Sequence, residues 1–253
     1  MNRSEVSGKP NAIEVIELVK RFGGVTATRD VTLSVPGGEC RAIIGPNGAG
    51  KTTFFNLLNG RMMPSAGTIK LHGTDITGLP AYRIARLGVA RTMQVTSLFP
   101  QLSVERTIAI GVQSKSRFLN PLADNRARLK QTIEKYVDAV GLGGSLSLQV
   151  GNLSYGDQRL LEIALALCQE PRVLLLDEPT AGLSENEIPK VVATIKKLTG
   201  TLTILIVEHR MSVVMDLAHR ITVLDNGAVF AHGSPEEIMR HAGVQEIYLG
   251  KRA

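Results

Sequence analysis

Short apolar runs alternate with helical patterns along most of the chain. Runs rich in valine, isoleucine and leucine have the length of buried strands, and apolar residues spaced three and four apart mark one face of a helix. The predicted strands are residues 13–19, 30–35, 40–44, 68–71, 89–93, 172–176, 202–207, 220–225 and 228–231. The predicted helices are residues 51–59, 80–87, 103–112, 124–141, 154–169, 185–198, 210–218, 234–241 and 243–248. Strands that alternate with helices form a mainly parallel sheet wrapped by helices.

Two stretches depart from this alternation. The strands predicted at 13–19, 30–35 and 40–44 follow one another without a helix, which indicates an additional antiparallel part. Residues 95–170 have almost purely helical patterns, which indicates a helical lobe inserted into the core. The predicted fold class is therefore α/β, with a mainly parallel sheet, an antiparallel β subdomain and an inserted helical subdomain.

A glycine-rich loop, GPNGAGKTT, lies between a predicted strand and a predicted helix and fits the pattern G-x-x-x-x-G-K-[ST]. Its glycines let successive backbone N–H groups face a β-phosphate. Lys51 offers a positive charge to the β- and γ-phosphates, and Thr52 offers a hydroxyl to Mg²⁺. The candidate nucleotide-binding residues are Gly45, Pro46, Asn47, Gly48, Ala49, Gly50, Lys51, Thr52 and Thr53. The alternative is an ordinary turn before a helix, but the full match favours a P-loop NTPase core that binds ATP with Mg²⁺.

Two carboxylates follow the apolar run VLLL at residues 173–176. Ligands of parallel α/β sheets bind beyond the carboxyl ends of the strands, where these side chains would emerge. We expect Asp177 to contact Mg²⁺ through its hydration shell and Glu178 to orient and polarise the attacking water. The alternative is a strand that simply ends in an acidic turn.

Three single residues are further candidates. Gln94 and His209 each follow a predicted strand, so both could reach the γ-phosphate region. We expect Gln94 to touch the metal or the water and His209 to donate a hydrogen bond to the γ-phosphate. Phe22 precedes the glycine-rich loop and could stack on adenine. For each of the three, an ordinary surface or packing role is the alternative.

A second helix start has the composition of an anion site. The stretch LSYGD at 153–157 precedes an apolar helix face, and its hydroxyl and glycine suit a phosphate at a helix N-terminus. It lies too far along the chain to close on the same chain's nucleotide. If two subunits pack head to tail, the Ser154 hydroxyl and the Gly156 N–H would meet the partner's γ-phosphate. The residues predicted to contact the partner's ATP are Leu153, Ser154, Tyr155, Gly156 and Asp157.

The composition narrows the range of partners. The formal net charge is +6, but lysines and arginines are scattered, and aromatic residues make up 4% of the chain with no tryptophan. Basic tracts and base-stacking platforms are therefore scarce, and we expect no specific nucleic-acid partner. Cys40 and Cys168 form no CxxC pair, so we expect buried thiols in a reducing compartment. No apolar run is long enough to span a bilayer, and residues 1–10 contain no apolar targeting segment.

In order and combination, these motifs resemble those of the nucleotide-binding subunits of ABC transporters. The motifs are the phosphate loop at 45–53, Gln94, the signature at 153–157, the acidic strand at 173–178, the loop AGLS at 181–184 and the switch histidine His209. The resemblance covers nearly the whole chain and implies a single ABC ATPase domain over 1–253. Its parts would be an α/β core over 1–94 and 171–253, a helical subdomain over 95–170 bearing the signature, and a C-terminal helical tail over 234–253.

Finer features resemble the importer branch for branched-chain amino acids, which includes urea and aromatic-acid importers. These features are KRFGG, residues 43–56, a signature with tyrosine before glycine, VEHRM and the ending VQEIYLG. The resemblance implies ATP hydrolysis that powers uptake of branched-chain amino acids or a related small polar solute. It implies a second ATPase subunit, identical or paralogous, a separate membrane permease, and indirectly a solute-binding protein. The location would be peripheral, on the cytoplasmic face of the bacterial inner membrane. Leu98, Phe99 and Pro100, with the helical lobe, would form a groove for a permease helix, with plain core packing as the alternative for Leu98 and Phe99.

The chain also departs from the family pattern. Tyr155 replaces the first signature glycine, Asp157 stands where glutamine or glutamate is usual, and Ser184 stands where aspartate is common. These departures could make two composite ATP sites unequal. An ATPase of lipopolysaccharide export, with a similar C-terminal tail, is an alternative identity. A nucleic-acid-linked ABC ATPase would need a long coiled coil, and a GTPase would need an NKxD motif, and the sequence has neither.

Overall fold

The computed structural model describes residues 9–92, 98–115 and 126–249. Its larger sheet has the strand order β10-β9-β3-β8-β7-β6. Five of these strands run parallel, and β10 pairs antiparallel with β9. The strands are β3 (Cys40–Ile44), β6 (Val89–Arg91), β7 (Val173–Asp177), β8 (Thr203–Val207), β9 (Arg220–Asp225) and β10 (Ala228–Gly233). Every residue of β3, β7 and β8 is buried, as expected for central strands covered on both faces.

A second sheet is antiparallel and has the order β2-β1-β4-β5. Its strands are β1 (Asn11–Phe22), β2 (Val25–Pro36), β4 (Ala66–Leu71) and β5 (Thr74–Asp75). Helix α1 (Lys51–Leu58) lies between the two sheets, and its Phe54 and Phe55 are fully buried against both. The antiparallel part predicted from the sequence is thus confirmed, and α1 packs at the junction of the two sheets.

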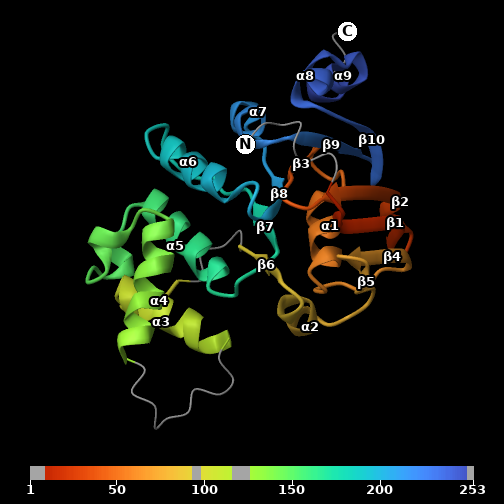
Figure 1. The fold of residues 1–253 in the computed structure, drawn as a ribbon. Helices are drawn as coiled ribbons and strands as arrows, with labels where there is room; N and C mark the ends of the chain where they lie inside the picture. The colour runs from red at the N-terminus through yellow and green to blue at the C-terminus, as the bar shows by residue number, and fades with distance from the viewer. Residues whose placement is uncertain (1–8, 93–97, 116–125, 250–253) are drawn as a thin grey trace.

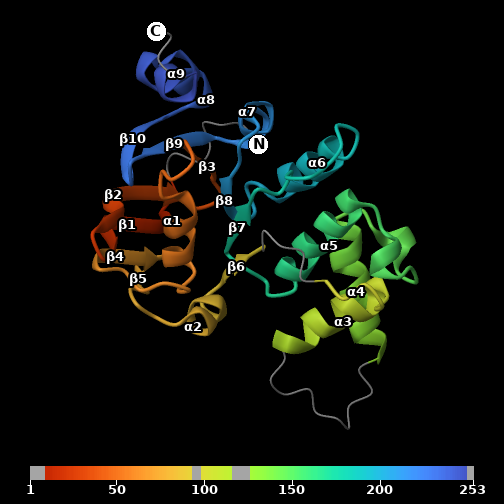
Figure 2. The same cartoon turned by 180° about the vertical axis from the view of Figure 1, so that it is seen from behind.

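All elements that the structure describes between β6 and β7 are helical. They are α3 (Val104–Lys115), α4 (Arg126–Ala139), the 3-10 turns Gly143–Ser145 and Val150–Asn152, and α5 (Tyr155–Leu167). These helices gather on one side of the parallel strands, and the antiparallel sheet lies on the other side (Figures 1 and 2). One apolar cluster runs from the larger sheet into these helices, so they share its core. The remaining helices are α2 (Ala81–Arg86), α6 (Ile188–Leu198), α7 (Met211–Leu217), α8 (Pro235–Arg240) and α9 (Ala242–Leu249).

Most predicted elements are confirmed, and the differences have local causes. β1 and β2 extend beyond their apolar runs because their polar ends pair with each other in one long hairpin. β5 was missed because it consists of Thr74 and Asp75, two exposed polar residues without an apolar signal. α6 begins at Ile188 rather than at residue 185, because a turn from Ser184 to Glu187 precedes it.

Two further expectations concern the cysteines and the membrane. Cys40 and Cys168 are both buried, as predicted, and burial raises the pKa of each thiol to about 12. Within the described residues, none of the helices has the length and apolar character that crossing a membrane requires.

Candidate functional site

Neighbouring parallel strands bring the candidate residues to one edge of the larger sheet. β3 leads into the glycine-rich loop, β7 ends at Asp177 and β8 ends just before Glu208 and His209. Because β8 pairs with both β3 and β7 in parallel, their carboxyl ends meet at the same edge. The structure therefore brings Lys51, Asp177, Glu178 and His209 together from distant parts of the chain.

The conformation of the glycine-rich loop depends on glycine at two positions. Gly45 has φ 154° and Gly50 has φ 94°, in the region that L-residues rarely adopt. A Cβ atom at Gly45 would lie 2.1 Å from the Leu224 carbonyl oxygen, and one at Gly50 would lie 2.3 Å from that of Ala27. Gly50 is also the N-cap of α1 and provides no side-chain cap. The first-turn N–H groups of α1 are therefore left for an anion.

The Lys51 ammonium lies folded across this loop. Its Nζ donates hydrogen bonds to the carbonyl oxygens of Gly45 at 2.7 Å and Pro46 at 2.9 Å. Burial lowers the pKa of Lys51, and the carboxylates of Glu178 and Asp177 oppose that shift. The Lys51 ammonium thus lies between the loop and the two acidic residues. There its positive charge would attract the oxygens of a bound phosphate.

Arg91, which the sequence reasoning missed, joins three elements behind the loop. Its Nη2 lies 2.6 Å from Oδ2 of Asp177, and its Nη1 lies 2.6 Å from Oδ1 of Asn56 in α1. Its guanidinium also lies 5.7 Å from the centre of the Phe55 ring. The available signal was the strand register, because Arg91 ends β6 beside Leu175 of β7. Arg91 holds one oxygen of Asp177 at the inner side of the site.

Glu178 and His209 contact each other at the mouth of the site. His209 Nε2 lies 3.1 Å from Glu178 Oε1. Glu178 has φ 48°, an unfavourable left-handed conformation for a residue with a side chain. Its N–H donates to the Val207 carbonyl at 2.9 Å, so the strand beside it holds that conformation. The carboxylate and the imidazole are therefore positioned by backbone contacts as well as by each other.

Glu208 is a second carboxylate that the sequence reasoning did not single out. It is 3% exposed, is hydrogen-bonded to the Thr180 hydroxyl, and accepts a hydrogen bond from the His209 N–H at 3.0 Å. Burial is the main cause that raises the pKa of Glu208 to about 7, and Glu178 adds to the effect. The available signal was its place directly before His209 at the end of a buried strand. Glu208 therefore links His209 to Thr180, in the segment that follows Glu178.

The predicted signature stretch forms the start of α5. Ser154 is the N-cap, and its Oγ accepts a hydrogen bond from the Asp157 N–H at 3.1 Å. The Gly156 N–H, which we expected to be available for a phosphate, donates to Oε1 of Glu187 at 2.9 Å. Asp157 forms an ion pair of 2.5 Å with Lys190. Leu153 is buried and Tyr155 is 73% exposed, so only some of the five predicted residues face outward.

Of the two remaining candidates, Phe22 and Gln94, the structure describes only Phe22. Phe22 ends β1 with 46% of its surface exposed, and the Lys20 ammonium lies 5.1 Å from the centre of its ring. The predicted stacking of this ring on adenine stays a prediction. Gln94 lies outside the described residues, so its predicted role stays a prediction.

The residues present fit Mg²⁺ bound with few protein ligands. Among the described residues, no group of three or more His, Cys, Asp or Glu side chains forms a metal cage. Thr52 is exposed in the first turn of α1, and the ion pair of Asp177 with Arg91 uses Oδ2 of its carboxylate. A hydroxyl and a carboxylate oxygen, completed by water and phosphate oxygens, are typical Mg²⁺ ligands.

A cavity of about 320 Å³ lies between β6 and α5. It is lined mostly by apolar side chains from β6 and α5, together with Leu98, and Arg91 and Glu162 add polar groups. Leu98 lines this cavity and also packs against the larger apolar cluster, so the permease groove stays a prediction beside its core-packing alternative, and the nearby Phe99 is 62% exposed. This groove shares Arg91 with the phosphate site.

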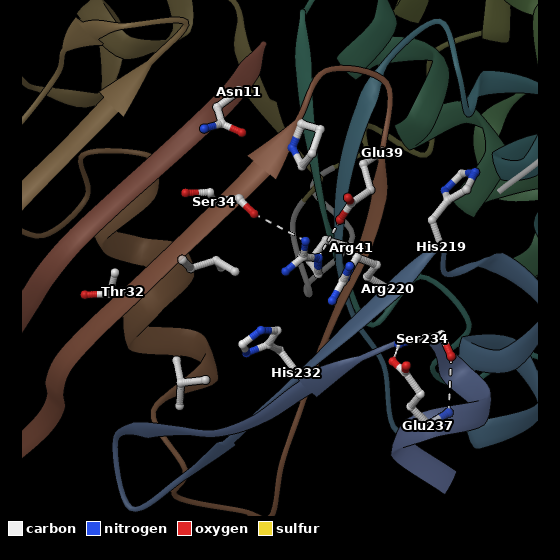
Figure 3. Close-up of a pocket in the computed structure, with 13 residues that line it drawn as sticks. Asn11, Thr32, Ser34, Glu39, Arg41, His219, Arg220, His232, Ser234 and Glu237 are labelled. Carbon is white, nitrogen blue, oxygen red and sulfur yellow. Dashed lines mark hydrogen bonds and ion pairs between the residues drawn. The ribbon is translucent and has the colours of Figure 1, made fainter. Parts of the chain in front are cut away.

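Another cavity, of about 660 Å³, lies near the starts of β3 and β9, at the opposite edge of the larger sheet from the glycine-rich loop (Figure 3). Its buried guanidinium, Arg41, pairs with Glu39 at 2.5 Å and donates to Thr222 Oγ1 and to the Ser34 carbonyl, each at 3.2 Å. These contacts connect β2 of the antiparallel sheet to β3 and β9. The charge buried in this cavity therefore holds the two sheets together.

Comparisons with known proteins agree with this geometry. Residues 28–181 match the family described as "ABC transporter". The chain is 39% identical over 249 residues to the high-affinity branched-chain amino acid transport ATP-binding protein BraF of Pseudomonas aeruginosa, covering 94% of this chain and 98% of BraF. It is 38% identical over 250 residues to LivG of Escherichia coli K12, described in the same words, with the same coverage of 94% and 98%.

Solved structures give the same result for the fold. A nucleotide-free ATP-binding cassette from an ABC transporter aligns with a TM-score of 0.84 and 25% identity, over 95% of this chain and 100% of that one. The ADP conformation of an ATP-binding cassette of an ABC transporter aligns with a TM-score of 0.85 and 26% identity, over 95% and 99%. The predicted α/β fold of a P-loop NTPase core is confirmed.

Proposed function

The chain belongs to the ABC transporter family and is an ATPase of that family, and we propose that it powers the uptake of branched-chain amino acids, or of a related small polar solute, through a separate permease. The observation that supports this most is the meeting of Lys51, Asp177, Glu178 and His209 at one edge of the sheet. The solute class follows the names of the relatives, which are branched-chain amino acid transport proteins.

Residues 45–53 hold the phosphates of ATP in this proposal. The backbone N–H groups of the loop and of the first turn of α1 bind the β- and γ-phosphates, and Lys51 moves from its contacts with Gly45 and Pro46 onto phosphate oxygens. Phe22 stacks on the adenine. Thr52, Asp177 and Gln94 would hold Mg²⁺, and the charge of the ion would offset that of the transferring phosphoryl group.

Glu178 and His209 act on the reacting atoms. The Glu178 carboxylate accepts a hydrogen bond from the attacking water and turns its oxygen toward the γ-phosphorus. The bond between that phosphorus and the bridging oxygen breaks as the new P–O bond forms, giving ADP and phosphate. The His209 imidazole, held 3.1 Å from Glu178, donates a hydrogen bond to a γ-phosphate oxygen. Glu208 fixes the backbone N–H of His209 and so positions the imidazole.

A second subunit completes each site. The start of α5 contacts Glu187 and Lys190 beside α6, and the phosphate loop precedes α1 on the other side of the larger sheet. Residues 153–157 therefore suit the γ-phosphate of a partner packed head to tail, identical or paralogous. A ligand shared across an interface favours the closed dimer, and hydrolysis removes the shared group.

The cavity beside β6 suits the permease. Its mostly apolar lining, which includes Leu98 and a few polar groups, fits one face of a short amphipathic helix. The helix would then touch the groove that contains Arg91, which holds Asp177. The chain would bind peripherally at the cytoplasmic face of the bacterial inner membrane, with a solute-binding protein acting on the permease. We assign the core to residues 1–94 and 171–253, the signature-bearing subdomain to 95–170 and the tail to 234–253.

An uptake experiment tests this function. A strain that lacks the gene should lose uptake of radiolabelled leucine, isoleucine and valine, and keep uptake of proline as the control. The wild-type gene should restore uptake, and a gene with Glu178→Gln should not. Unchanged leucine uptake in the deletion strain would contradict the solute class. ATPase activity that DNA stimulates and permease-containing membranes do not would contradict the transport function.

A further inference from the structure

Glu187 lies between the start of α5 and the loop at 181–184, just before α6. Its Oε1 accepts a hydrogen bond from the Gly156 N–H at 2.9 Å. Its Oε2 accepts from the Ser184 N–H at 3.0 Å and from the Ser184 hydroxyl at 2.7 Å. These donors, the Ser184 hydroxyl first, lower the pKa of Glu187 to about 2, so the carboxylate is ionised at neutral pH. An anion from the same chain thus occupies the N-terminus of the signature helix.

Gly156 makes this contact possible. Its φ is not among the positive values, so the backbone conformation there does not require glycine. The space is nevertheless tight, because a Cβ at 156 would lie 3.0 Å from Cβ, 3.1 Å from Cγ and 3.2 Å from Oε1 of Glu187, so that side chain would have to shift by a few tenths of an ångström. The absence of a side chain at this position therefore already has a use inside the single subunit.

An ordinary capping role explains only two of the three hydrogen bonds that Glu187 accepts. The bonds from Ser184 to Oε2 are those of a turn that leads into α6. The bond from Gly156 to Oε1 crosses to another helix and uses a donor that the proposed function assigns to the partner's γ-phosphate. One N–H cannot serve two anions fully, and two anions brought together at one donor repel each other.

We propose that Glu187 is a positioning residue that holds the Gly156 N–H in the separated subunit and gives it up to the partner's γ-phosphate when two ATP-bound subunits close. The inference rests on the proposed head-to-tail dimer. The same carboxylate accepts both Ser184 hydrogen bonds through Oε2, so the arrival of the phosphate is coupled to the loop at 181–184. The ion pair between Lys190 and Asp157 keeps α5 and α6 together meanwhile. Part of the free energy of closure is therefore used to displace a carboxylate.

The test uses the full-length chain with Glu178→Gln, which should bind ATP without hydrolysing it. Dimers are measured by sedimentation velocity across a titration of Mg²⁺-ATP. Adding Glu187→Gln keeps the size of the side chain and removes its charge, so the ATP concentration for half-maximal dimerisation should fall about tenfold. An unchanged or higher concentration would overturn the inference, because a purely structural role would weaken the start of α5 and demand more ATP.

Two controls separate the causes. Glu105→Gln makes the same charge change on an exposed side chain of α3 and should leave the concentration unchanged. Lys190→Gln removes the ion pair between α5 and α6 but leaves the bond between Gly156 and Glu187. It should therefore not lower the ATP concentration for half-maximal dimerisation. If the Glu178→Gln parent forms no dimers with ATP, the proposed function fails, and this inference fails with it.

A second measurement leaves Glu187 intact and so does not depend on how that variant folds. In the Glu178→Gln chain labelled with ¹⁵N-glycine, the Gly156 amide resonance should move when ATP closes the dimer, because its acceptor changes from carboxylate to phosphate. A resonance that stays in place while dimers form would also overturn the proposal.

Discussion

The starts of α1 and α5 are both helix N-termini with glycine in the first turn or at the cap, but the chain satisfies them in different ways. At α1 the N-cap is Gly50, which offers no side chain to the first turn. At α5 the Ser154 hydroxyl accepts from Asp157, and the Glu187 carboxylate accepts from Gly156. An N-terminus left open suits a ligand that binds first and to one chain. One closed by internal acceptors, of which Glu187 is an anion, suits a ligand that must displace that anion, which makes the second event conditional on the first.

The largest expected effect is on ATP turnover, and it concerns Glu178, which lies in the same site as the start of α1. Glu178→Gln should retain ATP binding but lower turnover by about 10²–10³, the loss typical of a group that stabilises charge in the transition state. The measurement is steady-state phosphate release beside ATP binding by equilibrium dialysis. Turnover close to wild type would exclude Glu178 as the carboxylate that polarises water.

Lys51→Ala tests whether the start of α1 binds phosphate in the single chain. Removing a charged donor from a partly buried anion site should raise the ATP dissociation constant about 10–100-fold. Lys197→Ala, which removes a charge from the exposed side of α6, is the matched control and should leave binding unchanged. An unaltered ATP dissociation constant in Lys51→Ala would contradict the view that the start of α1 binds phosphate in the single chain.

Ser154→Arg tests whether the start of α5 serves another chain. ATP binding to the separated subunit should stay unchanged, but a large side chain at both interfaces of the dimer should hinder closure and raise the ATP concentration needed for dimers about tenfold or more. Ser154→Ala separates the capping role, since loss of an N-cap hydroxyl costs about 1 kcal/mol of stability without blocking the surface. Loss of ATP binding by the separated Ser154→Arg subunit would mean that this end serves its own nucleotide.

The last expected effect concerns the stability of the chain rather than binding or turnover, and its source is Glu208, just after β8. Its pKa of about 7 in the folded chain is above its usual value of 4.5, so the folded state holds the proton more tightly than the unfolded state. The contribution of Glu208 to stability is therefore full below pH 4.5, falls as the pH rises to about 7, and is absent above it. Denaturant melts of the wild type, repeated between pH 4.5 and about 7, should show this decline in the free energy of unfolding. The same melts of Glu208→Gln should not show it. A decline that persists in Glu208→Gln would assign it to another group.

The residues that the sequence predicted well have their partners nearby in the chain. The glycine-rich loop, its lysine and the following helix form one continuous motif, so spacing alone indicated their geometry. The alternation of strands and helices likewise predicted the larger sheet, since short apolar runs and helical periodicity are local signals. The antiparallel part was predicted because no helix separates the early strands.

The residues that were missed have partners far away in the chain. Arg91 meets Asp177 only because β6 and β7 pair in a particular register. Glu208 meets Thr180 across two strand ends, and Glu187 meets Gly156 between two helices. In sequence each of the three is an ordinary charged residue, and its role follows from which elements pack together. The acceptor of the Gly156 N–H within the single chain escaped prediction for the same reason.

A mixing experiment tests most directly that each pocket is built from two chains. Lys51→Ala and Ser154→Arg should each be nearly inactive alone, because one damages the phosphate loop and the other the start of α5 in both sites of a dimer. In a mixed dimer both defects fall on one site and leave the other intact. The account predicts that an equimolar mixture regains about a quarter of wild-type turnover, since half of randomly formed dimers are mixed and each keeps one of its two sites. Turnover that remains at the average of the two separate variants would contradict it.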